Sequence, residues 1–132
     1  KDITGAIVSI DQMTPPESWL WGGSDWSEHP AKHVNEIIGV ELQAADPEAM
    51  AKRWAEVLDQ KLTREGGNYV VQMNPGIVRF IADSNGRGEG VSGIDISTAS
   101  VSNVIKHAME LGLPTKDNCV TVCGTDFFFI EE

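Results

Sequence analysis

Two stretches of the chain, GVELQAAD at residues 39–46 and GIDISTAS at residues 93–100, follow one pattern and start 54 residues apart (93 − 39). Each has a glycine, then alternating aliphatic and polar residues with an acid in third place, then a residue that suits the start of a helix. Such alternation predicts a strand with one apolar face, and the capping residue predicts a helix behind it. Repetition at a fixed offset therefore indicates two copies of one strand–helix unit.

The composition is typical of one soluble globular domain. Of the 132 residues, 41% are hydrophobic and 23% charged, and no apolar run approaches the ~18 residues that a membrane span needs. The formal charge of −10 argues against a nucleic-acid partner, because phosphates require a basic surface. We expect no membrane partner and a cytoplasmic location. Cys119 and Cys123 are expected to be core thiols, since their spacing on a strand is too long for a disulfide.

Residues 1–36 are expected to lie outside the main domain. The segment ITGAIVSI, residues 3–10, has the composition of a strand, and a linker or arm rich in Pro and Gly follows it. Bare indoles rarely stay in water, so the tryptophans of this arm should pack against the domain, a partner chain or a neighbouring module. They are Trp19, Trp21 and Trp26. The chain begins with Lys1 and not Met, which suggests a fragment or a processed form.

The main domain is expected over residues 37–132, with repeat units at about 37–83 and 90–132. In each unit the helix is followed by short apolar runs with turn residues between them, which predict three further strands. Each unit is therefore βαβββ in outline. The Gly-rich segment DSNGRGEG that starts at Asp83 lacks the pattern of a phosphate-binding loop, and we expect it to be a flexible hinge between the units.

The helix that follows the first strand has clear start signals. Asp46 is a suitable N-cap, and Pro47 suits the first helical position. Met50 and Trp54 lie one helical turn apart on an apolar stripe, so Trp54 is expected in the core and not in a ligand-binding platform. At the same offset in the second unit, Ser100 takes the place of Asp46 as the N-cap.

This arrangement resembles the vicinal oxygen chelate superfamily, which includes glyoxalase I, bleomycin-resistance proteins and extradiol dioxygenases. The resemblance covers about residues 37–132 and depends on GVELQAADPEAMAKRWAEVL, GEGVSGIDI and CGTDFFFIE. It implies an α+β fold in which tandem βαβββ units form a curved mixed sheet around a cleft, with helices on the outer face. Residues 3–10 also resemble the closing strand of a preceding module. The resemblance therefore implies a homodimer or pairing with a sister module.

Members of that superfamily that use a metal carry a His or similar ligand at the head of the first strand of each unit and a carboxylate late in each unit. The matching positions here are Gly39 and Gly93 at the strand heads and Arg79 and Phe128 later. None of these side chains is a metal ligand. The three histidines are spread through the sequence and offer no third ligand; they are His29, His33 and His107. We therefore expect no metal and no other cofactor.

The strand alternation indicates which side chains line the cleft. Val40 and Leu42 should face a helix, which turns their polar neighbours to the opposite face. The predicted ligand-binding cleft consists of Glu41, Gln43, Arg79, Asp95, Ser97 and Phe128. Three interpretations of its acids remain open. Arg79 could form a structural ion pair with one acid, an acid could stay free for a cation or for acid–base chemistry, or the carboxylates and Gln43 could hold a hard cation.

Two classes of function follow from this pattern, with a third in reserve. The first is a metal-free module that binds a small molecule, either cationic or aromatic, like the resistance-type members of the superfamily. The alternative is a metal-dependent glyoxalase-like lyase, isomerase or dioxygenase with noncanonical ligands, whose catalytic residues the sequence does not identify. A degenerate module with a purely structural role is the third. We favour the binding module over the enzyme.

Overall fold

The computed structural model describes residues 3–9, 11–15 and 17–132, and the described chain forms one eight-stranded mixed sheet with two α-helices. The first unit contains β1 (Ile37–Ala44), α1 (Pro47–Leu58), β2 (Leu62–Glu65), β3 (Asn68–Gln72) and β4 (Ile77–Ala82). The second contains β5 (Gly90–Thr98), α2 (Val101–Glu110), β6 (Thr115–Lys116), β7 (Cys119–Val122) and β8 (Thr125–Glu131). The α+β class and the two βαβββ units predicted from the sequence are confirmed.

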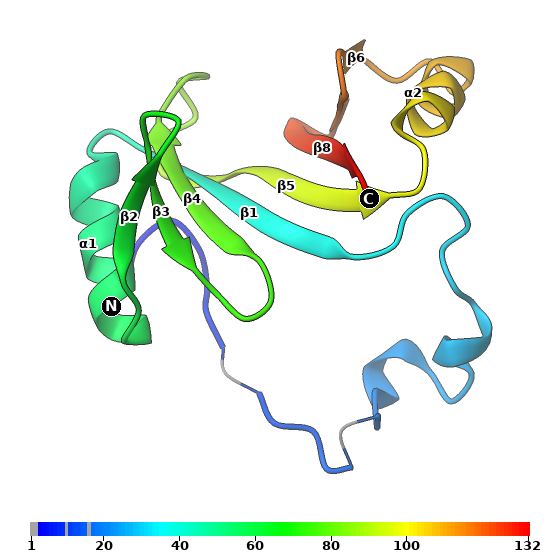
Figure 1. The fold of residues 1–132 in the computed structure, drawn as a ribbon, viewed down its shortest axis with the longest axis horizontal. Coiled ribbons are helices and arrows are strands. Elements are labelled where there is room, and N and C mark those ends of the chain that lie inside the picture. The colour runs from blue at the N-terminus through cyan, green and yellow to red at the C-terminus, as the bar shows by residue number, and fades with distance from the viewer. Residues whose placement is uncertain (1–2, 10, 16) are drawn as a thin grey trace.

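The sheet has an internal two-fold pattern. Its strand order is β2-β3-β4-β1-β5-β8-β7-β6, so the two first strands, β1 and β5, lie side by side at the centre. They pair antiparallel, while β1 pairs parallel with β4 and β5 pairs parallel with β8. Glu41 lies opposite Arg79 in one unit, and Asp95 lies opposite Phe128 in the other, so these two pairs occupy equivalent positions. Figure 1 shows the helices at opposite ends of an open sheet.

Both helices start where the sequence predicts. The Asp46 carboxylate accepts a hydrogen bond from the Ala49 amide at 2.9 Å, and the Ser100 hydroxyl accepts one from the Asn103 amide at 3.4 Å. These bonds satisfy amides that have no partner within the first helical turn. Trp54 is 6% exposed, which confirms its place in the core.

Two apolar clusters stabilise the two units. The first joins α1 to the sheet through buried side chains that include Leu42, Met50, Trp54, Val71 and Phe80. The second joins α2 to the sheet and is smaller; its buried members are Ala108, Val120 and Phe129. The second unit therefore buries fewer large side chains under its helix than the first. Leu111 lies just past the last turn of α2 and is 64% exposed.

The N-terminal segment differs from its prediction. Residues 3–9 contain no strand, and Ile10, the last residue of the predicted strand, lies outside the described residues. Gly5 has a φ of 92°, which interrupts an extended backbone. Ile3 and Ala6 pack against the first apolar cluster, and the Trp54 indole N–H donates to the Thr4 carbonyl at 2.9 Å. The segment is thus fixed by helix α1 and not by pairing in the sheet.

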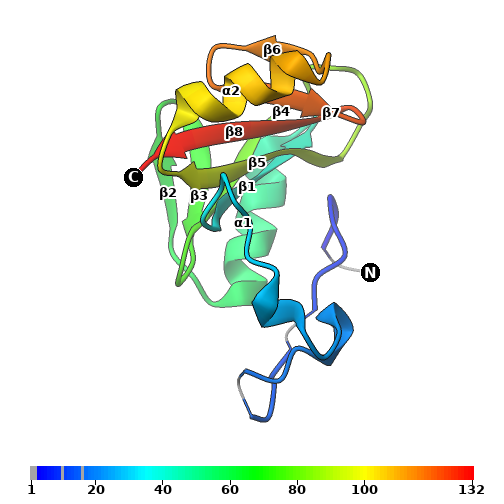
Figure 2. The same ribbon diagram turned by 90° about the vertical axis from the view of Figure 1, so that its right-hand side faces the viewer.

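The arm between this segment and β1 extends away from the sheet, as Figure 2 shows. It contains two short 3₁₀ turns, Leu20–Gly22 and Trp26–Glu28. The arm tryptophans stay exposed, so the expectation that they pack on this domain is not met within the described chain. Their exposed fractions are 46% for Trp19, 73% for Trp21 and 41% for Trp26. No described helix is long and apolar enough to cross a membrane.

Candidate functional site

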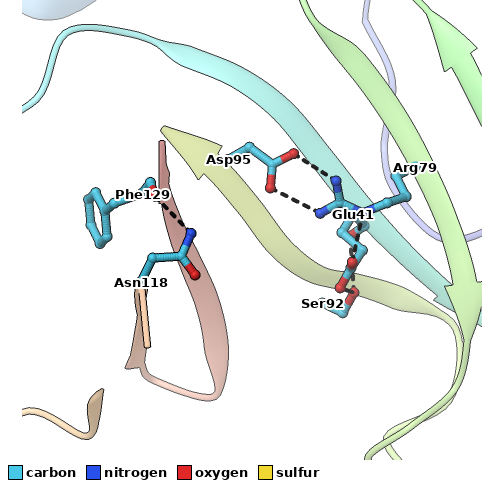
Figure 3. Close-up of polar contacts among 6 residues, drawn as sticks. All are labelled: Glu41, Arg79, Ser92, Asp95, Asn118 and Phe129. Carbon is cyan, nitrogen blue, oxygen red and sulfur yellow. Dashed lines mark hydrogen bonds and ion pairs between the residues drawn. The ribbon is translucent and has the colours of Figure 1, made fainter. Parts of the chain in front are cut away.

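Three of the predicted cleft residues meet at the centre of the sheet (Figure 3). They lie on the face turned away from both helices, because their strand neighbours Leu42 and Ile96 pack in the clusters under the helices. Arg79 of β4 donates from Nε to Glu41 Oε2 at 2.9 Å. Its two terminal nitrogens donate to both oxygens of Asp95, at 2.9 and 3.0 Å. We call Glu41, Arg79 and Asp95 the ion triad. It forms because the antiparallel pairing of β1 and β5 brings the two acids of the repeat to the same guanidinium.

The ion triad is largely shielded from water. Asp95 is 3% exposed and Glu41 9%. Burial disfavours the charged guanidinium, but the hydrogen bonds that it donates to Asp95 and Glu41 outweigh this effect and raise the pKa of Arg79 above its ordinary value. The hydroxyl of Ser92 also donates to Glu41 Oε1 at 2.9 Å. Of the three interpretations of the acids, the geometry therefore favours the structural ion pair. Arg79 pairs with both Glu41 and Asp95, whereas the sequence suggested a pair with one of them.

The two repeat glycines make room for this arrangement. A Cβ atom on Gly39 would overlap the carboxylate of Asp95, and one on Gly93 would lie 2.7 Å from Cε2 of Phe128. Neither contact is possible between real side chains, so both positions require glycine for space and not for backbone conformation. The glycine of the first unit thus makes room for an acid of the second unit, and the equivalent glycine of the second unit makes room for an aromatic ring of its own unit.

Gln43 connects the site to the loop between the two units. Its amide nitrogen donates to Asn85 Oδ1 at 2.8 Å and to the Gly88 carbonyl at 2.9 Å. Asp83 holds the same loop by accepting three backbone N–H bonds, of which the bond from Gly88 contributes most to lowering the pKa of its carboxyl. The segment predicted to be a flexible hinge is therefore a hydrogen-bonded loop.

Two polar atoms on this side of the sheet have no hydrogen-bond partner within the described part of the chain: Gln43 Oε1 and Ser97 Oγ. Gln43 and Ser97 are equivalent residues of the two units and are 1% and 0% exposed. Buried polar atoms normally have a partner, so each marks a place where a water molecule or another polar group would be stabilised.

Phe128, the sixth predicted residue, lines a cavity of about 290 Å³ in the second unit. The other lining residues are Lys116, Asp117, Asn118, Cys119, Thr121 and Asp126. Sequence reasoning missed Asp126, although it lies two residues before Phe128 on β8 and so faces the same side of the sheet. Thr121 donates to Asp126 Oδ1 at 2.7 Å and fixes its carboxylate at the wall of the cavity. The Arg79 guanidinium lies 5.9 Å from the centre of the Phe128 ring, so the cavity adjoins the ion triad.

Cys119 is an unsuitable nucleophile in this cavity. Burial raises the pKa of its thiol, and the negative charge of Asp126 raises it further. The thiol is therefore neutral at neutral pH, whereas catalytic cysteines react as thiolates. Both cysteines are free, as the sequence predicts for thiols, although Cys123 is exposed and not part of the core.

The residues present do not fit the metal centre that the fold implies. Gly39 and Gly93 have no donor atoms, and the carboxylates nearest to them already share the guanidinium of Arg79. Within the described residues, no three His, Cys, Asp or Glu side chains gather in a way that could hold a metal ion. His29 pairs with Asp25 at the surface, at 3.1 Å. His33 and His107 lie with ring centres 5.7 Å apart.

No protein-family model matches the chain, and no curated protein matches it significantly. Solved structures do match. A methylmalonyl-CoA epimerase from Mycobacterium tuberculosis aligns with a TM-score of 0.58 and 12% identity, over 78% of this chain and 91% of that protein. A glyoxalase/bleomycin resistance protein/dioxygenase superfamily member from Vibrio splendidus 12B01 aligns with a TM-score of 0.52 and 14% identity, over 74% and 98%. The chain has the vicinal oxygen chelate fold.

A hypothetical protein from Bacillus halodurans C-125 shares the same fold, with a TM-score of 0.59 and 13% identity over 74% of this chain and 94% of that one. At such identities, the likeness establishes the fold and leaves the activity to be argued from the site. In this vicinal oxygen chelate fold, the centre of the sheet holds an ion triad, and a cavity lies beside it in the second unit.

Proposed function

We propose that the protein is a binding module that holds a small organic cation, without a metal, in the cavity beside Phe128. One observation carries the proposal: the carboxylate of Asp126 and the ring of Phe128 line the same cavity. A carboxylate attracts a cation by charge, and the face of an aromatic ring attracts it through its quadrupole. This pairing narrows the cationic or aromatic ligand expected from the sequence to one that carries positive charge.

The charges around the cavity support the same ligand class. The ion triad contains two carboxylates and one guanidinium, which leaves one negative charge unbalanced close to the cavity. The cavity wall itself carries two negative side chains, Asp117 and Asp126, and one positive side chain, Lys116. The wall therefore has a further net charge of one negative unit. Asp126 and the ion triad are partly or largely buried, so their charges act on a ligand more strongly than those of the exposed Lys116 and Asp117. A volume of about 290 Å³ is at the small end for ligand sites, so the ligand is small.

Proteins of this fold can hold small molecules, since one solved methylmalonyl-CoA epimerase is in complex with methylmalonyl-CoA and NH₄⁺. That ligand belongs to the epimerase. For this chain, the domain boundary near residue 37 and pairing with a second copy or a sister module stay proposals. Sedimentation equilibrium of the whole chain tests the pairing, because a monomer at every concentration would exclude a homodimer.

The binding proposal is tested with benzyltrimethylammonium as a probe, titrated by calorimetry and by amide NMR. We expect saturable binding with shift changes on β7 and β8. Asp126→Asn should weaken binding by about tenfold or more, because a partly buried charge contact contributes at least ~1.4 kcal/mol. Asp59→Asn, which removes an exposed acid at the end of α1, is the control and should bind as the wild type does.

Two results would contradict the proposal. The first is equal binding by the wild type and Asp126→Asn, which would show that the carboxylate does not contact the probe. The second is one equivalent of manganese, nickel or zinc retained by protein purified without chelators or a histidine tag. Stoichiometric metal would favour the metal-dependent enzyme with displaced ligands over the metal-free module.

A further inference from the structure

A second cavity lies on the opposite side of the sheet, between helix α2 and strands β7 and β8. Its volume is about 240 Å³. The lining is apolar apart from His107 and includes Val104, Ala108, Leu111, Val120, Phe127 and Phe129. It shares no residue with the cavity beside Phe128. The binding function proposed above therefore does not account for it.

The internal repeat shows what fills the matching place in the first unit. The 54-residue offset that relates Gly39 to Gly93 also relates Trp54 to Ala108. On the sheet, Phe80 follows Arg79 and Phe129 follows Phe128, so these two phenylalanines are equivalent. In the first unit, the Trp54 indole packs edge-on against Phe80 with ring centres 5.8 Å apart. In the second unit, a methyl group replaces that indole.

The segments that precede the two units cover their apolar clusters differently. In the first unit, Ile3 and Ala6 pack on the apolar cluster, and the Gly5 backbone lies against the side chain of Met50. In the second unit, Val34 packs against the cluster but does not line the cavity. The residue equivalent to Met50 at the same offset is Val104, which lines the open cavity. The cavity therefore lies where the second unit has a methyl group in place of an indole, and where no residue of the preceding segment lines it within the described chain.

An apolar cavity of this kind has defined chemistry. The cavity is open to solvent on one side, where Leu111 is 64% exposed, and its apolar wall offers water few hydrogen-bond partners. An apolar ring bound there would remove this wall from water, and apolar sites of this kind bind small aromatic molecules. The lining atoms also lack van der Waals partners on the open side, and a flat ring would restore them. His107 offers a nitrogen at the wall for a polar group on the ring.

We propose that this cavity is a binding site for a flat, apolar aromatic molecule of about the size of indole. The ring takes the place that the Trp54 side chain takes in the first unit, between the helix and the second phenylalanine of the closing strand. The site is independent of the cation site, because the two cavities open on opposite faces of the sheet.

The test uses free indole as the probe and the whole chain, followed by amide NMR. We expect saturable shift changes in α2, β7 and β8, with no change around the ion triad. Ala108→Trp should fill the cavity with the chain's own indole, abolish these changes and raise the melting temperature. Lys106→Trp is the matched control, because it adds an indole to an exposed position of the same helix and should leave indole binding intact.

If Ala108→Trp fails to fold, Ala108→Leu fills part of the space and should weaken indole binding severalfold. Indole shifts that persist unchanged in a folded filled variant would overturn the proposal, as would the absence of shifts in the wild type. The proposal would also be overturned if the wild type self-associates, Ala108→Trp abolishes this association and free indole does not reverse it. That result would assign the cavity to a tryptophan of another copy's arm.

Discussion

Replacing Arg79 tests whether the ion triad holds the two units together. Arg79→Leu keeps most of the side-chain volume and removes the cation, which leaves two carboxylates buried at the centre of the sheet. Their side chains are only 12% and 4% exposed, for Glu41 and Asp95. Removing one partner from a buried ion pair costs about 3–5 kcal/mol, because the remaining charge loses both water and its counter-ion. We expect a loss of this size in the free energy of unfolding at pH 7.

Urea unfolding is the assay, followed by the fluorescence of buried Trp54 and by circular dichroism. The control is Arg64→Leu, since Arg64 is exposed, donates to the Gly67 carbonyl and lies over the Tyr69 ring. It should cost less than about 1 kcal/mol. Adding Glu41→Gln and Asp95→Asn to Arg79→Leu should recover most of the lost stability, because neutral amides are far less costly to bury than charges.

The reasoning would be refuted if Arg79→Leu cost no more than Arg64→Leu. Water would then reach the carboxylates freely, and the triad would be a surface ion pair in an open cleft. A large loss that the two amide substitutions do not relieve would also contradict it. That outcome would trace the loss to the packing of the Arg79 side chain over its neighbours and not to unpaired charge.

Three further predictions concern single groups. Gly39→Ala should lower the free energy of unfolding by about 1–3 kcal/mol, because the added methyl group would displace the carboxylate of Asp95. Gly90→Ala is the control in the same urea assay and should cost far less, because a methyl group there meets nothing within 4 Å. At pH 8, iodoacetamide should modify exposed Cys123 about tenfold or more faster than Cys119, as followed by mass spectrometry; equal rates would contradict the raised thiol pKa. The carboxyl of Asp83 has a lowered pKa in the folded protein. Its carboxylate therefore stabilises the loop fully above the ordinary pKa range of carboxyl groups, and this stabilisation is lost as the pH falls through the pKa of the folded state. In Asp83→Asn at pH 7, the loop amides should show the NMR shifts that the wild type shows only in acid.

The fold was accessible from the sequence because its signals are local and occur twice. Helix starts at Asp46 and Ser100 depend on residues within one turn, and the repeat offset relates the strands β1 and β5 without any knowledge of their pairing. The segment 3–9 was predicted wrongly for the opposite reason. Its aliphatic composition suits a strand, but a strand needs an edge to pair with, and the contact that fixes this segment is with a helix 50 residues away.

The candidate site was only partly accessible. The alternation of apolar and polar residues predicted that Glu41 and Asp95 point to the same face of the sheet. The register of β4, known to within one residue, predicted that Arg79 lies on that face too. Period-two reasoning cannot tell which acid a guanidinium reaches, because that depends on how β1 and β5 are staggered across the sheet. The role of Gln43 was hidden in the same way, since its partners belong to a loop more than 40 residues away. Asp126 lies two residues before Phe128 on β8, so the same alternation places both side chains on one face of the sheet.

The repeat explains why an ion triad lies at the centre of the sheet and a cavity lies beside it in the second unit. Antiparallel pairing of two equivalent strands brings their acids together at the centre, so duplication creates two negative charges at one place. A single Arg79 in the first unit engages both of them. The equivalent position in the second unit then needs no cation, and Phe128 occupies it and lines a cavity. The difference between two matched residues, Arg79 and Phe128, therefore accounts for the ion triad at the centre of the sheet and the cavity beside it.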